Sequence, residues 1–343
     1  MDKLGVITGG GDSPGINAAI RAVVRKAKDE GMDVLGFENG WAGLLEGNKW
    51  VLDRKDVSGI LPVGGTFLGS SRTNPFAIDV GPEKAAENYD ANNLDALIVI
   101  GGDDTLGVAH KLRDYDVNAV GIPQTIDNDL AETEYSIGFN SALSQVMKAV
   151  DQLHTTASSH HRVMILEVMG RDSGWIALFG GLAGGADSIL VPEKPFRVKD
   201  VKKRIEDRES AGKHFSIVVI SEGASPEGLD QQITRDSGTD SFGHVKLGGI
   251  GHYLREQLDA ILDMPIRVTT LAYLQRGGEP TAFDRLLATR YGVTAVELCL
   301  DGQFDRMVAS KGNKIESVSL EKVIANSPKP IDSHLLEMKD LFY

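Results

Sequence analysis

Two aspartates near the middle of this chain are spaced for acid–base chemistry. Residues 123–129 read Pro-Gln-Thr-Ile-Asp-Asn-Asp, so Asp127 and Asp129 occupy alternate positions after an apolar run. One such carboxylate can accept a hydroxyl proton while the other orients it, a division of labour that general-base catalysis often uses. A turn rich in Asp and Asn is the structural alternative. The motifs elsewhere in the chain favour the catalytic interpretation.

A second acidic pair, Asp103 and Asp104, follows another apolar run in the segment Ile-Val-Ile-Gly-Gly-Asp-Asp-Thr at residues 98–105. Magnesium takes one or two protein carboxylates together with phosphate oxygens and water, so we predict that Asp103 binds Mg2+. Either aspartate could instead cap a helix. Turns of this Gly-Gly-Asp type also occur in other kinases, so the motif indicates phosphoryl transfer without identifying the acceptor.

A glycine-rich turn at residues 8–15, Thr-Gly-Gly-Gly-Asp-Ser-Pro-Gly, lies between an apolar run and an amphipathic helical pattern. Backbone N–H groups and the positive end of a helix make such a turn an anion site. Pro14 stands where the dinucleotide-binding fingerprint needs its third glycine, and no Lys-Ser or Lys-Thr pair follows for a P-loop. A nicotinamide-dependent oxidoreductase is therefore disfavoured, and a merely tight turn is the remaining alternative.

Three further glycine-rich segments each contain an arginine, whose planar donor group suits phosphate oxygens. These arginines are Arg72 in residues 64–72, Arg171 in residues 167–174 and Arg276 in residues 273–278. For each segment the alternative is a tight turn with a solvated side chain.

Short apolar runs separated by helical patterns predict the elements that position these groups. The runs are residues 4–8, 33–37, 96–100, 118–122, 162–168, 216–220 and 268–272. Strands that alternate with helices predict an α/β fold with mainly parallel sheets, which bind ligands at the carboxyl ends of their strands. Residues 139–159 read as one long helix that could connect two α/β halves.

The composition indicates a soluble globular protein. The 343 residues, 41% hydrophobic and 25% charged, suggest about two domains. A net charge of −13 argues against nucleic acid or an anionic membrane as partner. No apolar stretch is long enough to span a bilayer, and the first residues leave no room for a secretory signal. The single cysteine, Cys299, lies in an apolar run, so we expect a buried, inert thiol and a cytoplasmic location.

Taken together, in this order and spacing, the six motifs closely resemble the 6-phosphofructokinase family, and the resemblance extends from Gly5 to about Gly292. It implies two Rossmann-like three-layer domains with mainly parallel sheets and an active site in the cleft between them. Residues 1–138 plus about 275–325 would bind the phosphoryl donor and Mg2+. Residues 139–274 would bind the sugar phosphate, with the 326–343 tail as an optional part.

The resemblance also implies a role for each motif. Asp127 would be the general base that draws the proton from the 1-hydroxyl of fructose 6-phosphate. Thr125 and Asp129 would flank this base, and Arg171 would stabilise charge on the moving phosphoryl group. The residues implied in donor binding are Gly10, Arg72, Gly102, Asp104, Thr105 and Gln124. Those implied in sugar-phosphate binding are Thr125, Asp127, Met169, Gly170, Arg171, Glu222, Tyr273 and Arg276.

Two more arginines, Arg162 and Arg267, match family positions that reach the 6-phosphate from a neighbouring subunit. The resemblance therefore implies a homodimer or homotetramer with shared active sites. Tyr273 stands where some members have histidine, which favours the branch that includes pyrophosphate-dependent enzymes.

The phosphoryl donor depends on two residues that point in different directions. An aspartate at position 104 is typical of the family's pyrophosphate users, because a carboxylate there fills and repels the place of a nucleotide α-phosphate. Those enzymes usually also carry a lysine at position 124, where this chain has Gln124, a neutral donor of hydrogen bonds. We expect pyrophosphate as the donor, with ATP as the alternative.

A regulatory site is left open by the sequence. The basic positions of an allosteric nucleotide site between subunits in bacterial ATP-dependent members are matched by Arg21, Arg25, Arg54 and Lys213. His154 and Ala211 depart from that pattern, and Asp187 can stand for its acidic group. Arg21 and Arg25 lie four residues apart on a predicted helix and can equally form a solvated face. A non-catalytic sugar-phosphate sensor is a distant alternative, because such a protein would lack the base or the metal ligand.

Overall fold

The computed structural model describes residues 1–229, 234–239 and 245–341. These residues form two compact units, which are described separately. Unit 1 comprises residues 1–141 and 276–329, and unit 2 comprises the described residues of 142–239, 245–275 and 330–341.

Unit 1 contains a seven-stranded sheet in the order β13-β12-β5-β4-β1-β2-β3. Its strands are β1 (Lys3–Thr8), β2 (Asp33–Phe37), β3 (Lys49–Leu52), β4 (Ala96–Gly101), β5 (Ala119–Pro123), β12 (Arg306–Lys311) and β13 (Lys314–Ser319). The five inner strands run parallel, and only the edge strands β3 and β13 are antiparallel to their neighbours. The predicted α/β fold with mainly parallel sheets is confirmed.

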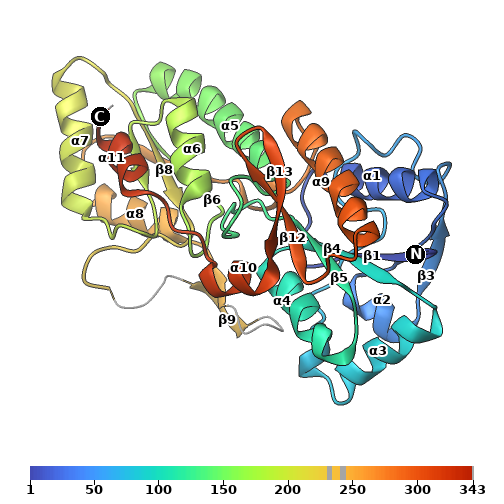
Figure 1. Ribbon diagram of the computed structural model, residues 1–343. Coiled ribbons are helices and arrows are strands. Elements are labelled where there is room, and N and C mark those ends of the chain that lie inside the picture. Colours follow the sequence, from blue (N-terminus) through green and yellow to red (C-terminus); the bar gives the residue numbers. More distant parts are fainter. Residues whose placement is uncertain (230–233, 240–244, 342–343) are drawn as a thin grey trace. The chain divides into compact units, whose positions relative to one another are not determined.

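Helices cover both faces of this sheet, because its strands are apolar on both sides. On one face α1 (Ile16–Asp29) and α9 (Ala282–Leu300) lie side by side (Figure 1). They form one core with alternate residues of β1 and β4, while the intervening residues face a second core. The second core is covered by α2 (Trp41–Glu46), α3 (Gly81–Ala91), α4 (Asp103–Leu112) and α10 (Leu320–Asn326). Short 3-10 turns occupy Pro75–Ala77 and Arg113–Tyr115.

The predicted inert cysteine is confirmed. Cys299 lies near the end of α9, on the side that faces the core, and is fully buried. Burial raises the pKa of its thiol to about 12, so the thiolate form is inaccessible at neutral pH.

Unit 2 contains a four-stranded parallel sheet in the order β11-β6-β8-β7. The strands are β6 (Val163–Val168), β7 (Ser188–Leu190), β8 (Ser216–Ser221) and β11 (Ile266–Thr270), and an antiparallel pair is formed by β9 (Thr234–Thr239) and β10 (Val245–Leu247). The helices are α5 (Phe139–His160), which begins in unit 1, α6 (Trp175–Gly184), α7 (Val198–Ser210), α8 (Ile250–Asp259) and α11 (Ser333–Leu341). The expected long helix from residue 139 is therefore present as α5.

One predicted strand is displaced. The apolar pattern placed it at residues 268–272, but β11 ends at Thr270. The chain then turns through Ala272, whose φ is +41°, into a 3-10 helix at Ala272–Gln275. Pairing with β6 in the register Ile266↔Val163 fixes where the strand begins, which a local pattern cannot do.

No helix in the described part of the chain is both long and apolar enough to cross a membrane.

The contact between α1 and α9 depends on Gly292, where an added Cβ would lie 2.7 Å from the Ala19 carbonyl oxygen. Gly107 in α4 has open space at the same point. Gly292→Ala should therefore lower the free energy of unfolding by about 1–3 kcal/mol through overpacking. Gly107→Ala should raise it by about 0.5–1 kcal/mol through helix propensity. Calorimetric unfolding of both variants checks this, and equal effects would show that the helix contact is not tight.

Candidate active site

The loops that carry the predicted chemistry of unit 1 emerge at one edge of its sheet. β1 and β4 pair in parallel from Leu4↔Ala96 to Thr8↔Ile100, so their carboxyl ends coincide. The chain continues from β1 to β2 on one side and from β4 to β5 on the other. Loops at such a reversal of strand order diverge and leave room for a ligand at the carboxyl end of the sheet.

The glycine-rich loop after β1 is tied to the segment that ends in Arg72. Gly10 adopts a φ of +82°, donates its N–H to the Ser71 carbonyl at 3.1 Å and accepts the Ser70 hydroxyl at 2.6 Å. Because this amide is already engaged, a donor phosphate at Gly10 would depend on close approach of the backbone, which the missing side chain permits. Arg72 itself is exposed.

Thr105 joins this loop to the end of β4. It is 2% exposed, and an added Cβ at either Gly9 or Gly101 would lie within 2.7 Å of its side chain. The side chain of Thr105 thus packs between two glycines and positions the loop after β1 against the end of β4.

Asp103 and Asp104 form the first turn of α4, and the N-cap is Gly102. Neither aspartate is the N-cap, so the alternative role as a helix cap is wrong. Asp103 is exposed and Asp104 half-buried, both at the helix end that favours negative charge. The described residues contain no cluster of three or more His, Cys, Asp or Glu that could hold a metal. A lone exposed carboxylate fits Mg2+, which takes its remaining ligands from phosphate and water.

The loop after β5 holds Asp127 half-buried through its neighbours. The Asp127 N–H donates to Thr125 Oγ1 at 3.2 Å. Asn128 adopts a φ of +52°, and its side chain bridges the loop by accepting from Ser136 N at 2.9 Å and donating to the Glu134 carbonyl. Asn tolerates this left-handed conformation better than most residues. Asn128 and Ser136 were not singled out in the sequence, although an Asn between two Asp residues is a signal for such a turn.

Gln124 connects this loop to the glycine-rich loop. It is 1% exposed, and its Nε2 donates to the Gly11 carbonyl at 3.1 Å and to Ser13 Oγ at 2.9 Å. Its Oε1 is buried and has no hydrogen-bond partner among the described residues. Gln124 thus joins the two loops through hydrogen bonds, which we call the Gln124 tie. Its Oε1 can accept a further hydrogen bond from water or from a ligand group.

The end of unit 1 also reaches the Asp129 loop, which the sequence did not indicate. Lys329 donates its N–H to the Asp129 carbonyl at 2.5 Å and its ammonium to the Thr133 carbonyl at 2.9 Å. Burial lowers the pKa of Lys329 to about 8, against the opposing effect of Asp129 and Glu134. Lys329 therefore places a partly buried ammonium next to the Asp129 loop.

Asp284 has a strongly shifted pKa but no catalytic geometry. Burial raises its pKa to about 6, and its carboxylate accepts hydrogen bonds from Gly138 N, Ser141 N and the Ser141 hydroxyl. These bonds fix the start of α5 and use both oxygens, so the residue is structural.

Arg276 lies in unit 1. Its Nη1 donates to the Asp12 carbonyl at 3.1 Å, and an added Cβ on Gly11 would lie 2.5 Å from it. The structure therefore brings Arg276 to the glycine-rich loop.

Unit 2 collects most of the predicted sugar-phosphate residues at the carboxyl ends of three neighbouring strands. Met169, Gly170 and Arg171 follow β6, Glu222 follows β8 and Tyr273 follows β11. The Gly223 N–H donates to the Gly170 carbonyl at 3.0 Å, and buried Gln275 accepts from Met169 N at 3.3 Å. An added Cβ at Gly223 would lie 1.8 Å from the Arg171 carbonyl oxygen, so only glycine allows these loops to pack.

Arg162 and Arg267 lie at the opposite end of the same strands. Arg162 precedes β6, and Arg267 is the second residue of β11, paired with Met164. A six-residue strand spans about 20 Å. Within one chain these arginines therefore cannot contact the same small ligand as Met169.

Three of the possible regulatory residues have internal partners. Arg54 pairs with Asp29 at 3.1 Å, and Asp187 pairs with Arg208 at 2.8 Å and accepts from Ile217 N. Burial and the charge of Arg25 lower the pKa of Arg21, as expected for like charges on one helix face. The rings of His154 and Phe215 meet edge to face. The contact partners of Asp187 give it a structural role, and the predicted regulatory site stays a prediction.

Comparisons with known proteins agree with this geometry. A family model described as "Phosphofructokinase" matches residues 3–299. The chain is 50% identical to a protein named pyrophosphate–fructose 6-phosphate 1-phosphotransferase from Streptomyces coelicolor, over 99% of each chain. It is 44% identical to an ATP-dependent 6-phosphofructokinase from Corynebacterium efficiens, over 95% of each.

Solved structures are similar as well. The Pichia pastoris phosphofructokinase matches with a TM-score of 0.86 and 34% identity over 99% of this chain, which spans 37% of that longer chain. A pyrophosphate-dependent phosphofructokinase from Marinobacter aquaeolei matches with a TM-score of 0.84 and 25% identity, over 97% of this chain and 86% of that one.

Replacing Gln124 by Leu should loosen the glycine-rich loop, because the Gly11 carbonyl and the Ser13 hydroxyl lose their buried donor. An unmet buried polar group costs about 1–3 kcal/mol, so pyrophosphate binding should weaken about tenfold. Calorimetric titration with magnesium pyrophosphate measures this. Gln303→Leu, at an exposed site, is the matched control. Unchanged affinity in Gln124→Leu would mean that the tie does not shape the anion site.

Proposed function

The chain belongs to the phosphofructokinase family, and we propose that it transfers a phosphoryl group from pyrophosphate to the 1-hydroxyl of fructose 6-phosphate, giving fructose 1,6-bisphosphate. The observation that carries this proposal is the edge of the unit 1 sheet at which the paired strands β4 and β5 end. There the half-buried base candidate Asp127 follows β5, and the acidic first turn of α4 follows the adjacent strand β4.

Proton transfer and charge stabilisation are assigned to this chain's own residues. Asp127 accepts the proton of the 1-hydroxyl, while Thr125, whose Oγ1 accepts the Asp127 N–H, fixes the backbone of the loop at the base. Asp129 flanks the base, and Arg171 stabilises negative charge on the transferred group. Most of the barrier reduction in such reactions comes from positioning and electrostatics.

Magnesium fits the donor set at the start of α4. Asp103 would hold the ion, and the bound ion would neutralise charge on the oxygens of the donor. We assign Gly10, Arg72, Gly102, Asp104, Thr105 and Gln124 to the donor side, and Met169, Gly170, Glu222, Tyr273 and Arg276 to the sugar phosphate.

Pyrophosphate is the preferred donor because of Asp104. A second carboxylate in the first turn of α4 adds negative charge where a nucleotide would bring its α-phosphate. The 50% identical relative named as a pyrophosphate enzyme supports this choice.

ATP is the second candidate donor, and Gln124 favours it. The side chain at this position is neutral and already bonded to the glycine-rich loop, so it adds no positive charge to balance an inorganic donor. ATP-dependent relatives at 44% identity support this alternative.

The placement of Arg162 and Arg267 supports a homo-oligomer with shared sites. Because these arginines lie at the amino ends of their strands, they can serve the 6-phosphate only from a neighbouring chain. We therefore propose a homodimer or homotetramer. A cytoplasmic location fits the buried, reduced Cys299, and cell fractionation tests it.

Asp127→Ser should lower kcat by at least about 100-fold with little effect on KM for fructose 6-phosphate, because a general base contributes on that scale. Asp114→Ser, at an exposed site, is the control. Near-normal turnover would remove Asp127 from the mechanism.

Asp127→Ser also tests whether the active sites are shared between subunits. Arg162→Ala should be inactive alone, and co-refolding it with Asp127→Ser in equal amounts should restore about a quarter of wild-type activity in dimers. No recovery in verified mixed oligomers would mean that Asp127 and Arg162 do not serve one site.

The donor assignment predicts that fructose 1,6-bisphosphate forms faster from magnesium pyrophosphate than from magnesium ATP at matched concentrations, and that chelation of magnesium abolishes both rates. Asp104→Gly should shift the ATP-to-pyrophosphate rate ratio toward ATP by at least about tenfold, because it removes the repelling charge. A wild-type preference for ATP would contradict the donor assignment without affecting the assignment of the base.

A further inference from the structure

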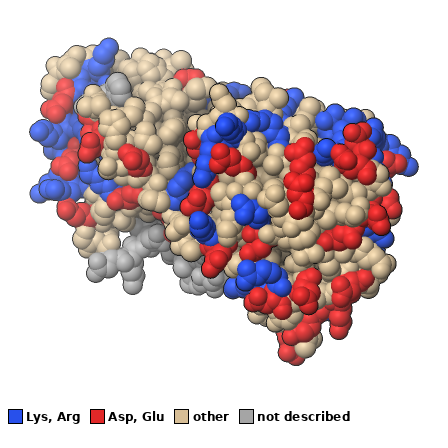
Figure 2. Space-filling view, viewed as in Figure 1, with Lys and Arg blue, Asp and Glu red and all other residues tan. Residues whose placement is uncertain are grey.

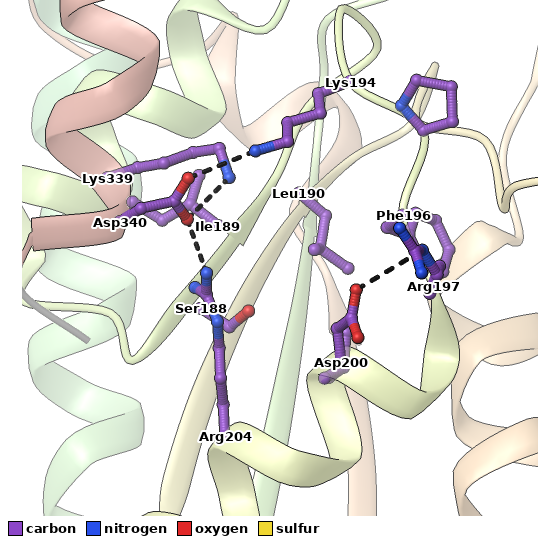
Figure 3. A pocket seen from close by; sticks show the side chains of 12 residues that line it. Ser188, Ile189, Leu190, Lys194, Phe196, Arg197, Asp200, Arg204, Lys339 and Asp340 are labelled. Carbon is purple, nitrogen blue, oxygen red and sulfur yellow. Dashed lines mark hydrogen bonds and ion pairs between the residues drawn. The ribbon is translucent and has the colours of Figure 1, made fainter.

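A basic pocket lies in unit 2, outside the residues assigned above. It is formed by the end of β7, the loop that follows, the first turns of α7 and the end of α11 (Figure 3). The charged side chains that line it are Lys194, Arg197, Asp200, Arg204, Lys339 and Asp340. These four cations face the two lining carboxylates and Glu227, which pairs with Arg197 at 2.8 Å, in a chain whose net charge is −13. Figure 2 shows Lys and Arg side chains gathered over α7.

Three of these cations converge on one carboxylate. Asp340 accepts from Arg204 at 2.5 Å, from Lys339 at 3.2 Å and from Lys194 at 3.3 Å (Figure 3). Burial alone would raise the pKa of Asp340, but these partners lower it to about 2. The Asp340 carboxylate therefore occupies a position that favours an anion, and three cations share it.

Lys339 is the most deeply buried of these three cations. It is 6% exposed, and Asp340 is the only acceptor for its ammonium in the part of the chain that the structure describes. Burial lowers its pKa, and the charges of Lys194 and Arg204 lower it further. A buried ammonium has three donors and is stable only when anionic or polar acceptors surround it. A further anion would supply them.

The pocket also has apolar walls. Leu190 lies between the Asp340 cluster and the Arg197–Asp200 pair, and Phe196 lies beside Arg197 (Figure 3). The first turn of α7 lines the pocket as well, and the positive end of that helix favours an anion. A ligand that suits both parts carries a doubly charged head with several acceptor oxygens and a short carbon skeleton.

We propose that this pocket is a regulatory site for a small phosphate monoester, whose phosphate binds Lys194, Arg204 and Lys339 in competition with Asp340. The carbon skeleton lies along Leu190 and Phe196. The pocket uses no residue of the proposed active site.

A hydrogen bond made by the residue next to the pocket reaches the Arg171 loop. Glu193, next to Lys194, accepts the N–H of Gly174 at 2.8 Å, and burial raises the pKa of Glu193. Gly174 is the N-cap of α6 and ends the loop that contains Arg171. A ligand that draws Lys194 inward therefore acts on a segment bonded to this loop. This regulatory part rests on the proposed role of Arg171, whereas binding does not.

The simpler alternative is that the cations only dock α11 through Asp340. If the cations only dock α11, no second anion is needed, and the pocket would not bind phosphate esters. Binding is therefore the property that separates the two.

Hydrogen–deuterium exchange with sn-glycerol 3-phosphate, without substrates and at constant ionic strength, tests binding and its location. In the wild-type protein we expect protection of Ser188–Arg204 and Ser333–Leu341. Lys339→Met, which keeps the buried stem, should weaken this protection at least about tenfold, because a charge-assisted bond is lost. Lys202→Met, on α7 but outside the pocket and paired with Glu206, should leave it unchanged.

Absence of protection in the wild-type protein, or equal protection in Lys339→Met, would overturn the proposed site. Protection around residues 169–174 that is the same in all three proteins belongs to the sugar-phosphate site and is counted separately.

The regulatory part is tested at saturating substrates, where competition at the active site is removed. Glycerol 3-phosphate should change the maximal rate of the wild-type enzyme and of Lys202→Met but not of Lys339→Met. Binding without any change in maximal rate would refute regulation while leaving the site. Near-normal turnover in Asp127→Ser, or a wild-type preference for ATP, would contradict the proposed function alone.

Discussion

The parallel pairing of β1, β4 and β5 is the constraint on which the candidate active site depends. Each strand is buried on both faces, so the sheet cannot slide without exposing apolar side chains. In this register the strands end together, and the loops that follow carry Gly10, Asp103 and Asp127. Acidic groups that repel one another are thereby held at one edge by the burial of hydrocarbon elsewhere.

Close backbone approach then converts neighbouring loops into a defined surface. Glycines at positions 9 and 101 admit Thr105, and Gln124 bonds the loop after β5 to the one after β1. In unit 2, Gly223 has the same function against the Arg171 carbonyl. Such contacts fix the reacting groups through rigid strands and not through long side chains, which is what catalysis by positioning requires.

The two ends of the unit 2 sheet have different uses in this interpretation. The carboxyl end carries Met169, Arg171 and Glu222, whereas Arg162 and Arg267 lie about 20 Å away at the amino end. The basic pocket beneath α11 adds a third location, joined to the first by Glu193.

The sequence by itself determined the family, the α/β class, most of the strands and the motifs after them, because these depend on local patterns of apolar residues, glycines and carboxylates. Tertiary structure decided what depends on distant partners. It ended β11 at Thr270 through pairing with β6, brought Lys329 to the Asp129 loop and made Gln124 a tie between loops. It also brought Lys194 and Arg204 to Asp340, which follows them by 146 and 136 positions. Residues so far apart in the chain carry no local signal of contact, since only burial in a common fold makes them neighbours.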